Sequence, residues 1–134
     1  MNRRTRSRVR GESGASAVEL VLYMPILMIT ILFAVQFSLV YLGGQVASGA
    51  AREAARTARV TGSYDQTVAV ANRIIAQIGE GVLDEPQVEP QIGEEMARVT
   101  VSGKASQILP FLPIPEVSET VQGPVERFVE DTGP

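Results

Sequence analysis

Residues 14–44 decide the fold, and they read GASAVELVLYMPILMITILFAVQFSLVYLGG. Glu19 is the one charged residue in this stretch, and the run from Leu20 to Leu42 has no charge. As an α-helix that run would be about 35 Å long, which is enough to cross the roughly 30 Å hydrocarbon core of a bilayer. Its clearly polar side chains are Thr30, Gln36 and Ser38. The stretch therefore predicts a membrane-spanning helix.

The helical pattern continues beyond the glycine pair at 43–44. The segment up to Val60 is rich in alanine and contains no proline. Spacings of four, three and four residues place a set of alanines on one smooth face, namely Ala47, Ala51, Ala54 and Ala58. Small residues permit close approach between helices, although a helix-favouring surface segment would have the same composition. We therefore expect one long helix that continues outside the membrane.

Arginines form a second face of this extension. The face consists of Arg52, Arg56 and Arg59, and Glu53 precedes Arg56 by three residues. Side chains at this spacing are neighbours on a helix, so the sequence predicts an ion pair between Glu53 and Arg56.

Composition excludes several kinds of site. The 134-residue chain has no cysteine, no histidine and no tryptophan. It therefore lacks disulfides, the usual zinc ligands and the commonest general base, and its few aromatic residues argue against nucleic-acid binding. No nucleophile–base pair, phosphate loop or calcium-loop pattern is present in the sequence. We expect no enzymatic activity, no cofactor or metal, and no small-molecule substrate.

Charge is distributed unevenly along the chain. Five arginines precede the apolar run, at positions 3, 4, 6, 8 and 10, whereas the remainder of the chain is acidic. Basic residues beside a membrane span stay in the cytoplasm. The N-terminus is therefore expected to be cytoplasmic and the C-terminal part extracytoplasmic. The arm itself, being polar and short, should be irregular up to Gly14.

A second helix is predicted after Thr61-Gly62. Ser63 and Gln66 have the spacing of a capping box, and Gly79 and Gly81 should end the helix. Its apolar stripe would consist of Val68, Ala71, Ile74, Ile75 and Ile78.

Short strands are predicted after this helix. The acidic segment Asp84–Glu95 contains Pro86 and Pro90 and is interpreted as a solvated loop with room for a short edge strand at Gln87–Ile92. Alternation from Ala97 to Ser102 predicts a strand with Val99 and Val101 on one face.

The last part of the chain begins with a proline-rich loop. Residues 109–115, LPFLPIP, cannot form regular structure, and would either cover the small core or present a contact patch to another subunit. A final strand face follows, interrupted at Gly123-Pro124, and a polar tail runs from Glu130 to Pro134. The strand face consists of Val117, Val121, Val125 and Val129.

These elements predict an α+β protein. A long N-terminal transmembrane helix would continue outside the membrane, and a second helix and a small antiparallel sheet of two or three strands would follow. We divide the chain into a basic cytoplasmic leader (residues 1–14), the transmembrane helix and its extension (15–60), and a small extracytoplasmic domain (61–134).

The spacing of Gly14 and Glu19 resembles the leader-cleavage motif of type IV pilins. In that family a membrane peptidase cuts directly after the glycine, and the apolar segment is retained. The resemblance implies a cut between Gly14 and Ala15, with Glu19 as the fifth residue of the mature chain. Glycine leaves an extended backbone unobstructed in a peptidase cleft.

A narrower resemblance is carried by three features: Glu19-Leu20, Pro25 six residues after the glutamate, and the segment AAREAAR at 50–56. Together they resemble the TadE-like family, which are minor pilins or pseudopilins of the tight-adherence (Flp) pilus machinery. The family usually has phenylalanine at Leu20 and glycine at Ala54. The resemblance, over residues 11–60, implies assembly roles for Glu19, Leu20 and Pro25, and a helix-packing segment that includes Ala51, Arg52, Glu53, Ala55 and Arg56.

Glu19 has two interpretations. In the first turn of a helix, an interfacial carboxylate gains a fraction of a kcal/mol from the helix macrodipole. Alternatively, it enters an apolar filament and pairs with the freed amine of Ala15 on a neighbouring subunit. Because an unpaired buried carboxylate is costly, that pairing would set the subunit register. The resemblance to pilins implies the second role.

The sequence thus favours a structural pilin-like subunit. Its partners would be the membrane, a prepilin peptidase, other pilin subunits, and the assembly platform and ATPase of a surface pilus used for adhesion or secretion. It would lie in the cytoplasmic membrane as a single-pass protein, or at the cell surface in a pilus. One alternative is a permanent signal-anchor protein with an extracytoplasmic binding domain. Another is a long secretory signal that is cut after the site Ala47-Ser48-Gly49.

Overall fold

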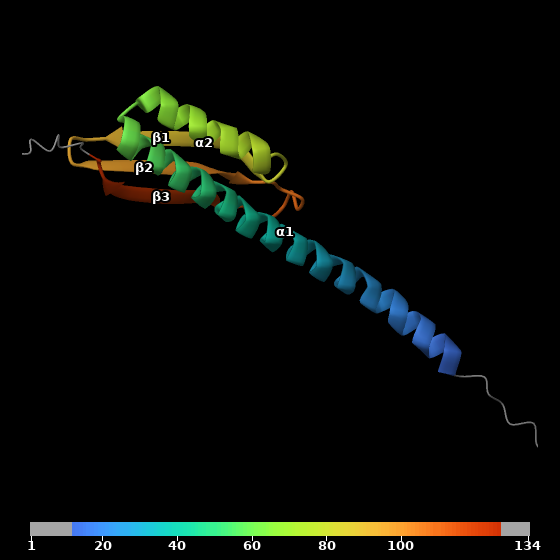
Figure 1. Cartoon of the computed structure of the whole chain (residues 1–134). Helices are drawn as coiled ribbons and strands as arrows, with labels where there is room; N and C mark the ends of the chain where they lie inside the picture. Colours follow the sequence, from blue (N-terminus) through green and yellow to red (C-terminus); the bar gives the residue numbers. More distant parts are fainter. Residues whose placement is uncertain (1–11, 127–134) are drawn as a thin grey trace, which may run out of the picture. The chain divides into compact units, whose positions relative to one another are not determined.

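The computed structural model describes residues 12–126 and confirms the α+β class (Figure 1). The described elements are α1 (Glu12–Thr61), α2 (Tyr64–Ile78), β1 (Leu83–Ile92), β2 (Met96–Ala105) and β3 (Glu116–Pro124). The basic arm up to Gly11, Val129 and the predicted tail Glu130–Pro134 lie outside the described residues.

Helix α1 is a single helix of 50 residues. It runs through Pro25 and through Gly43-Gly44 without interruption, as the hydropathy and the alanine content predicted. Proline removes one backbone hydrogen bond from a helix, a loss that a long helix tolerates. The second part of α1, from Gln36 onward, belongs to the same compact unit as α2 and the sheet, whereas the unit before it ends at Val35.

The core of the domain is built on the alanines of α1. Ala47, Ala51, Ala54 and Ala58, which the sequence placed on one face, are all fully buried. Ala50 and Ala55 are buried beside them, in one cluster with residues of α2 and with Val99 and Val101 of β2. Because a methyl group is the only side chain between the backbones, this part of α1 can lie close to its neighbours.

Helix α2 begins as predicted at the Ser63 cap. The Ser63 hydroxyl oxygen accepts a hydrogen bond from the Gln66 amide at 3.4 Å, and Gly79 caps the other end. The reciprocal half of the capping box does not form, because the Ser63 amide donates instead to Thr61 Oγ1 at 3.2 Å.

The predicted apolar stripe of α2 is partly wrong. Ala71 and Ile75 are buried, but Ile78 is 57% exposed because it is the last residue of the helix. Thr67 occupies the buried position one turn before Ala71. Its hydroxyl donates to the Ser63 carbonyl oxygen at 2.7 Å, so its burial leaves no unpaired polar group.

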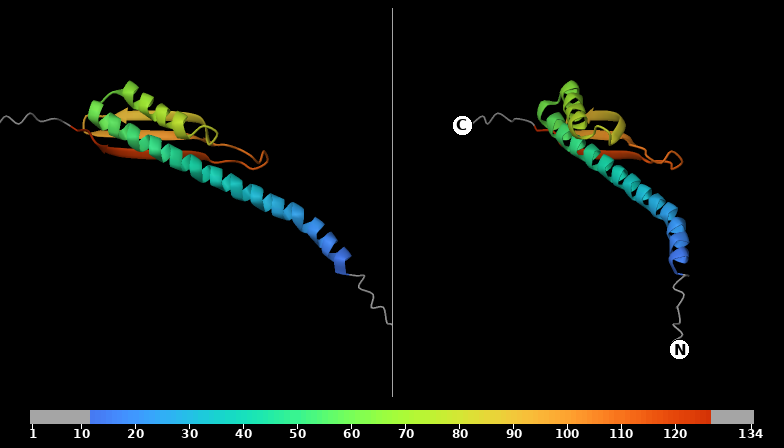
Figure 2. Two further views of the ribbon diagram at one scale, coloured as in Figure 1. Left: turned by 45° about the vertical axis from the view of Figure 1, so that its right-hand side comes forward. Right: turned by 90° about the vertical axis from the view of Figure 1, so that its right-hand side faces the viewer.

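The sheet has the order β1-β2-β3, and both pairs are antiparallel. Along β2, Ala97, Val99 and Val101 are buried whereas Arg98 and Lys104 are exposed. Helices α1 and α2 lie on the same side of the sheet (Figure 2), so one face is packed and the other is open to water. The predicted inward face of β3 is confirmed for Val117 and Val121, which pack against the core.

The predicted edge strand at Gln87–Ile92 is confirmed, but the prediction of a loop is wrong for Asp84–Pro86, where the strand has already begun. Strand β1 extends from Leu83 to Ile92 and includes both Pro86 and Pro90. The pairing with β2 shifts between Asp84 and Gln87, where Glu85 has a positive φ of 49°. An edge strand with a bulge accommodates prolines because their missing amide donors are not needed on the outer side.

The packing of α1 predicts that Ala54→Leu destabilises the domain. Ala54 is fully buried, and three added carbons have no space without displacing the core. Overpacking of this kind costs about 1–3 kcal/mol. The matched control is Ala69→Leu, because Ala69 lies exposed on α2. In thermal unfolding of the full chain in mild detergent, Ala54→Leu should lower Tm clearly and Ala69→Leu should not. Equal Tm values for the two variants would contradict this packing.

Candidate functional site

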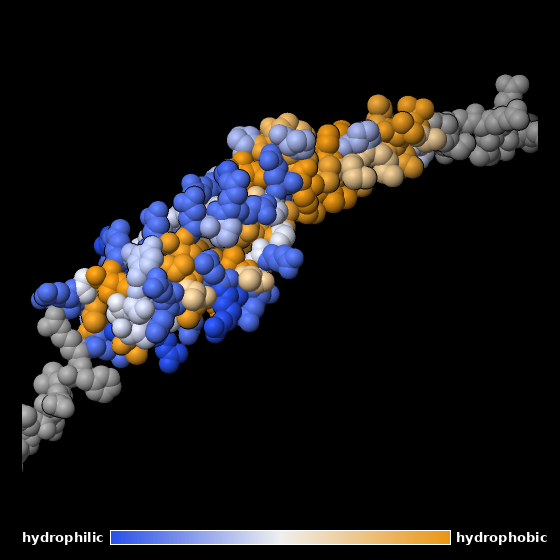
Figure 3. Space-filling model, turned by 90° about the horizontal axis from the view of Figure 1, so that it is seen from above, coloured by the Kyte–Doolittle hydropathy of each residue, from blue (hydrophilic) through white to orange (hydrophobic). Residues whose placement is uncertain are grey.

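The N-terminal half of α1 presents an apolar surface. Among the described residues, Ser16–Thr61 is the stretch long and apolar enough to cross a membrane. Nearly all of its large side chains up to Val35 are exposed, and Figure 3 shows hydrophobic surface along this part of the chain. The Thr30 hydroxyl donates to the Ile26 carbonyl oxygen at 2.8 Å, so it has a partner within the helix. Such a surface requires lipid or other apolar helices around it.

The residues predicted to act in processing and assembly lie on this half. Glu19, Leu20 and Pro25 are exposed. The Gly14–Ala15 bond lies in the first turn of α1, because the helix begins at Glu12. The expectation of an irregular chain up to Gly14 is therefore wrong for its last residues.

The predicted helix-packing segment divides between the interior and the surface. Ala51 and Ala55 are buried in the domain core, whereas Arg52, Glu53 and Arg56 are exposed. Within the described part of the chain, Glu53 and Arg56 do not form the predicted ion pair.

Gln36 is the residue whose importance the sequence did not reveal. It lies in the apolar run yet is only 1% exposed. Its Nε2 donates to the Ser106 carbonyl oxygen at 3.1 Å, and its Oε1 accepts from the amides of Ile108 at 2.8 Å and Leu109 at 3.3 Å. The side chain thus holds the loop after β2 against α1. In the sequence, the one signal for this role was an amide side chain within a long apolar run.

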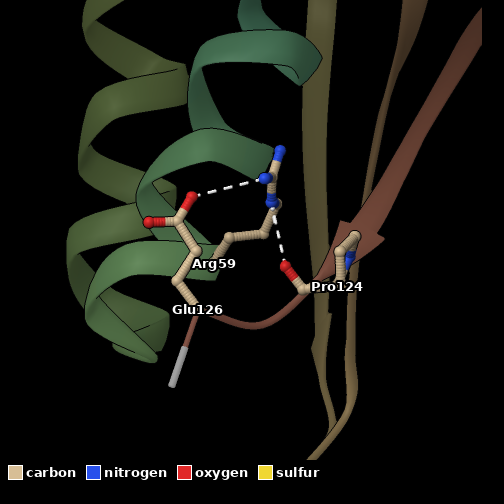
Figure 4. Close-up of polar contacts among 3 residues, drawn as sticks. All are labelled: Arg59, Pro124 and Glu126. Carbon is tan, nitrogen blue, oxygen red and sulfur yellow. Dashed lines mark hydrogen bonds and ion pairs between the residues drawn. The ribbon is translucent and has the colours of Figure 1, made fainter. Parts of the chain in front are cut away.

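Arg59 attaches the C-terminal end of α1 to residues at and after the end of β3 (Figure 4). Its Nε donates to the Pro124 carbonyl oxygen at 3.0 Å, its Nη2 lies 3.3 Å from Glu126 Oε1, and its own carbonyl oxygen accepts from the Glu126 amide at 3.1 Å. A side chain at Gly123 would meet the Arg59 Cδ at 3.0 Å, so glycine leaves room for this contact.

Gln36 and Arg59 therefore attach α1 to the domain near opposite ends of the sheet. Gln36 binds residues that follow Ala105, and Arg59 binds Pro124, the register partner of Met96. The helix between them spans about 35 Å and a ten-residue strand spans about 33 Å, so the two lengths match. This match fixes which part of α1 belongs to the domain.

The open sheet face carries a polar ladder. Arg98 donates twice to Gln122, and the Thr100 and Thr120 hydroxyls are 2.9 Å apart. At its end, the hydrogen bond from Lys104 and its positive charge lower the pKa of Glu85, and Glu85 raises the pKa of Lys104 in return. This pair is fully exposed, so it contributes little to stability.

Comparison with known proteins gives one match. Residues 14–56 match the family model described as TadE-like protein. This match confirms, over those residues, the resemblance predicted from the sequence. No curated protein and no solved structure matches the chain. The TadE-like segment contains the apolar half of α1, Gln36 and the buried alanines up to Ala55, but it ends before α2 and the sheet.

The bonds of Gln36 predict a specific effect of Gln36→Leu. The substitution leaves the amides of Ile108 and Leu109 without an acceptor, which costs about 1–3 kcal/mol for each buried group. Hydrogen–deuterium exchange of the full chain in detergent should then be faster in the segment 106–112. Gln45→Leu is the control, because Gln45 is exposed on the same helix. Unchanged exchange in the Gln36 variant would contradict the role assigned to this side chain.

Proposed function

We propose that this protein is a pilin-like structural subunit, a minor pilin or pseudopilin, and not an enzyme. The observation that carries the proposal is the division of α1. One half is exposed and apolar, and the other half is built into a folded domain. Such a helix can be covered by lipid before assembly and by apolar helices of other subunits afterwards. The TadE-like match over the same helix supports this function.

Processing would convert the membrane precursor into the assembling form. A prepilin peptidase cuts between Gly14 and Ala15 and removes the basic arm. The new amine then lies four residues before Glu19, one helical turn away. In an apolar filament an unpaired carboxylate is costly, so Glu19 pairs with the amine of a neighbouring subunit. The arginine-rich arm supports a cytoplasmic N-terminus and an extracytoplasmic domain.

Assembly would need further partners. On the family resemblance, these are other pilin subunits, the assembly platform and the ATPase of a Flp-type pilus that serves adhesion or secretion. Leu20 and Pro25 lie on the exposed half of α1, where they are available to such partners.

A permanent single-pass anchor with an extracytoplasmic binding domain is the second candidate. One observation favours it: the exposed stretch of residues 16–35 would be about 30 Å long, so a bilayer alone could cover it. The two candidates differ in leader removal and in the need for Glu19.

The pilin function predicts that the membrane-extracted chain begins at Ala15. Intact mass and N-terminal sequencing of the protein from its native host measure this directly. Gly14→Val should block the cut and leave the arm attached, because a branched side chain obstructs the peptidase cleft. Gly11→Val, three residues earlier in the same arm, should be cut normally. An arm retained in the unmodified chain would favour the anchor.

The pairing of Glu19 predicts that Glu19→Gln removes the protein from assembled filaments. Processing should continue, and the processed chain should accumulate in the membrane fraction while the filament fraction loses it. Glu80→Gln is the matched control, because Glu80 is an exposed carboxylate of the domain. Immunoblots of the sheared filament and membrane fractions provide the readout. Equal incorporation of both variants would show that Glu19 has no assembly role.

A further inference from the structure

The segment between β2 and β3, residues 106–115, is called the proline loop here. It carries exposed apolar side chains, with Phe111 71% and Ile108 46% exposed, while Leu109 is buried. The sequence allowed this loop to be a core cover or a contact patch, and the structure shows one buried and two exposed apolar side chains. Leu109 fills the interior, and Phe111 extends into the surroundings.

Gln36 fixes the position of the proline loop along α1. The three hydrogen bonds of its side chain end on Ser106, Ile108 and Leu109. Exposed apolar side chains of α1 continue on both sides of Gln36, from Val35 before it to Phe37, Tyr41 and Leu42 after it. The loop is therefore held beside the last turns of the exposed apolar part of α1, and not at the Arg59 end of the domain.

The helical rise gives the depth of this level. From Leu20, the first residue after the Glu19 charge, to Gln36 the helix advances about 24 Å, at about 1.5 Å per residue. The hydrocarbon core of a bilayer is about 30 Å thick. When Glu19 lies at one membrane surface, Gln36 therefore lies just inside the opposite boundary of the hydrocarbon. Tilting the helix moves Gln36 deeper. Tyr41, exposed about 7 Å farther along, then falls at the headgroups, where tyrosine is favoured.

The proline loop is also suited to a medium with little water. The amides of Ile108 and Leu109 donate to Gln36, and the amide of Leu112 donates to the Leu109 carbonyl oxygen at 3.2 Å. Pro110 and Pro113 have no amide hydrogen to satisfy. Among the described residues 108–113, the amide of Phe111 is thus the one without a partner.

Two carbonyl oxygens of the loop share one side-chain donor. Gln107 Nε2 donates to the carbonyl oxygens of Leu109 at 2.8 Å and Leu112 at 3.0 Å. In lipid each unsatisfied backbone group costs several kcal/mol, so the hydrogen bonds that these groups already make lower the cost of placing the loop at the boundary of the bilayer. The charged residues beside the loop, Lys104 and Glu85, are paired at 2.6 Å and suit the headgroup layer.

We propose that the proline loop inserts Phe111 and Ile108 into the outer leaflet of the bilayer, at the boundary between headgroups and acyl chains. The loop and α1 then form two contacts with the same membrane, which fixes the height and orientation of the domain before assembly. This inference rests on the proposed membrane insertion of α1.

Tryptophan fluorescence tests the insertion, because the chain has no native tryptophan. Three variants of the full chain, Phe111→Trp, Ile29→Trp and Met96→Trp, are reconstituted into phosphatidylcholine vesicles with brominated acyl chains. All three positions are exposed. Ile29 lies near the middle of the apolar stretch, and Met96 lies at the far end of β2, about 30 Å from the loop.

Phe111→Trp should emit at a shorter wavelength than Met96→Trp. Bromine near the headgroup end of the acyl chain should quench most of its emission. Bromine near the terminal methyl should quench Ile29→Trp most strongly, and Met96→Trp should not be quenched. Quenching of Ile29→Trp without quenching of Phe111→Trp would overturn the loop insertion alone. Short-wavelength emission without quenching would assign the loop to a protein neighbour instead. An unquenched Ile29→Trp would overturn membrane insertion of α1 and the loop proposal together.

Discussion

A single buried amide separates the two uses of α1. Before Gln36, the helix exposes apolar side chains that only lipid or other apolar helices can cover. From Gln36 onward, the helix is the main support of a folded domain. Gln36 uses its donor and its acceptor on the backbone of a loop some 70 residues away in sequence, so its burial leaves no unpaired group. This residue lies at the start of the part of α1 that belongs to the folded domain.

The packing of the domain depends on how closely α1 can approach α2 and the sheet. A face of alanines gives α1 a thin, flat contact surface, and the apolar side chains of β2 fill the remaining space. Arg59 completes the attachment at the far end, through Pro124 and Glu126. The TadE-like match includes Gln36 and most of the alanine face but not α2 or the sheet. The match therefore covers both the exposed apolar part of α1 and most of the face on which the domain is built.

The sequence predicted what depends on local periodicity. The full length of α1 followed from an uncharged run and an alanine-rich extension, and the Ser63 cap and the alternation of Val99 and Val101 were equally readable. Strand β1 was underestimated because two prolines and several acids are typical of a loop, and only its position at the sheet edge makes them acceptable. The contacts of Gln36 and Arg59 join residues more than 60 positions apart, so no local pattern could reveal them. The pilin-type roles of Gly14, Ala15 and Glu19 stay predictions from resemblance.

The central claim is that lipid covers the apolar part of α1 before Gln36, whereas the alanine-rich part of α1 supports a domain outside the membrane. Because the chain has no cysteine, single cysteines can be introduced at Val21, Ile29, Gln45 and Glu53 and labelled in intact cells with a membrane-impermeant maleimide. All four side chains are exposed in the isolated chain, so protection must come from the surroundings. We predict that positions 21 and 29 are protected and that positions 45 and 53 react from outside the cell. Labelling at 21 or 29, or protection of 45 and 53, would contradict the account.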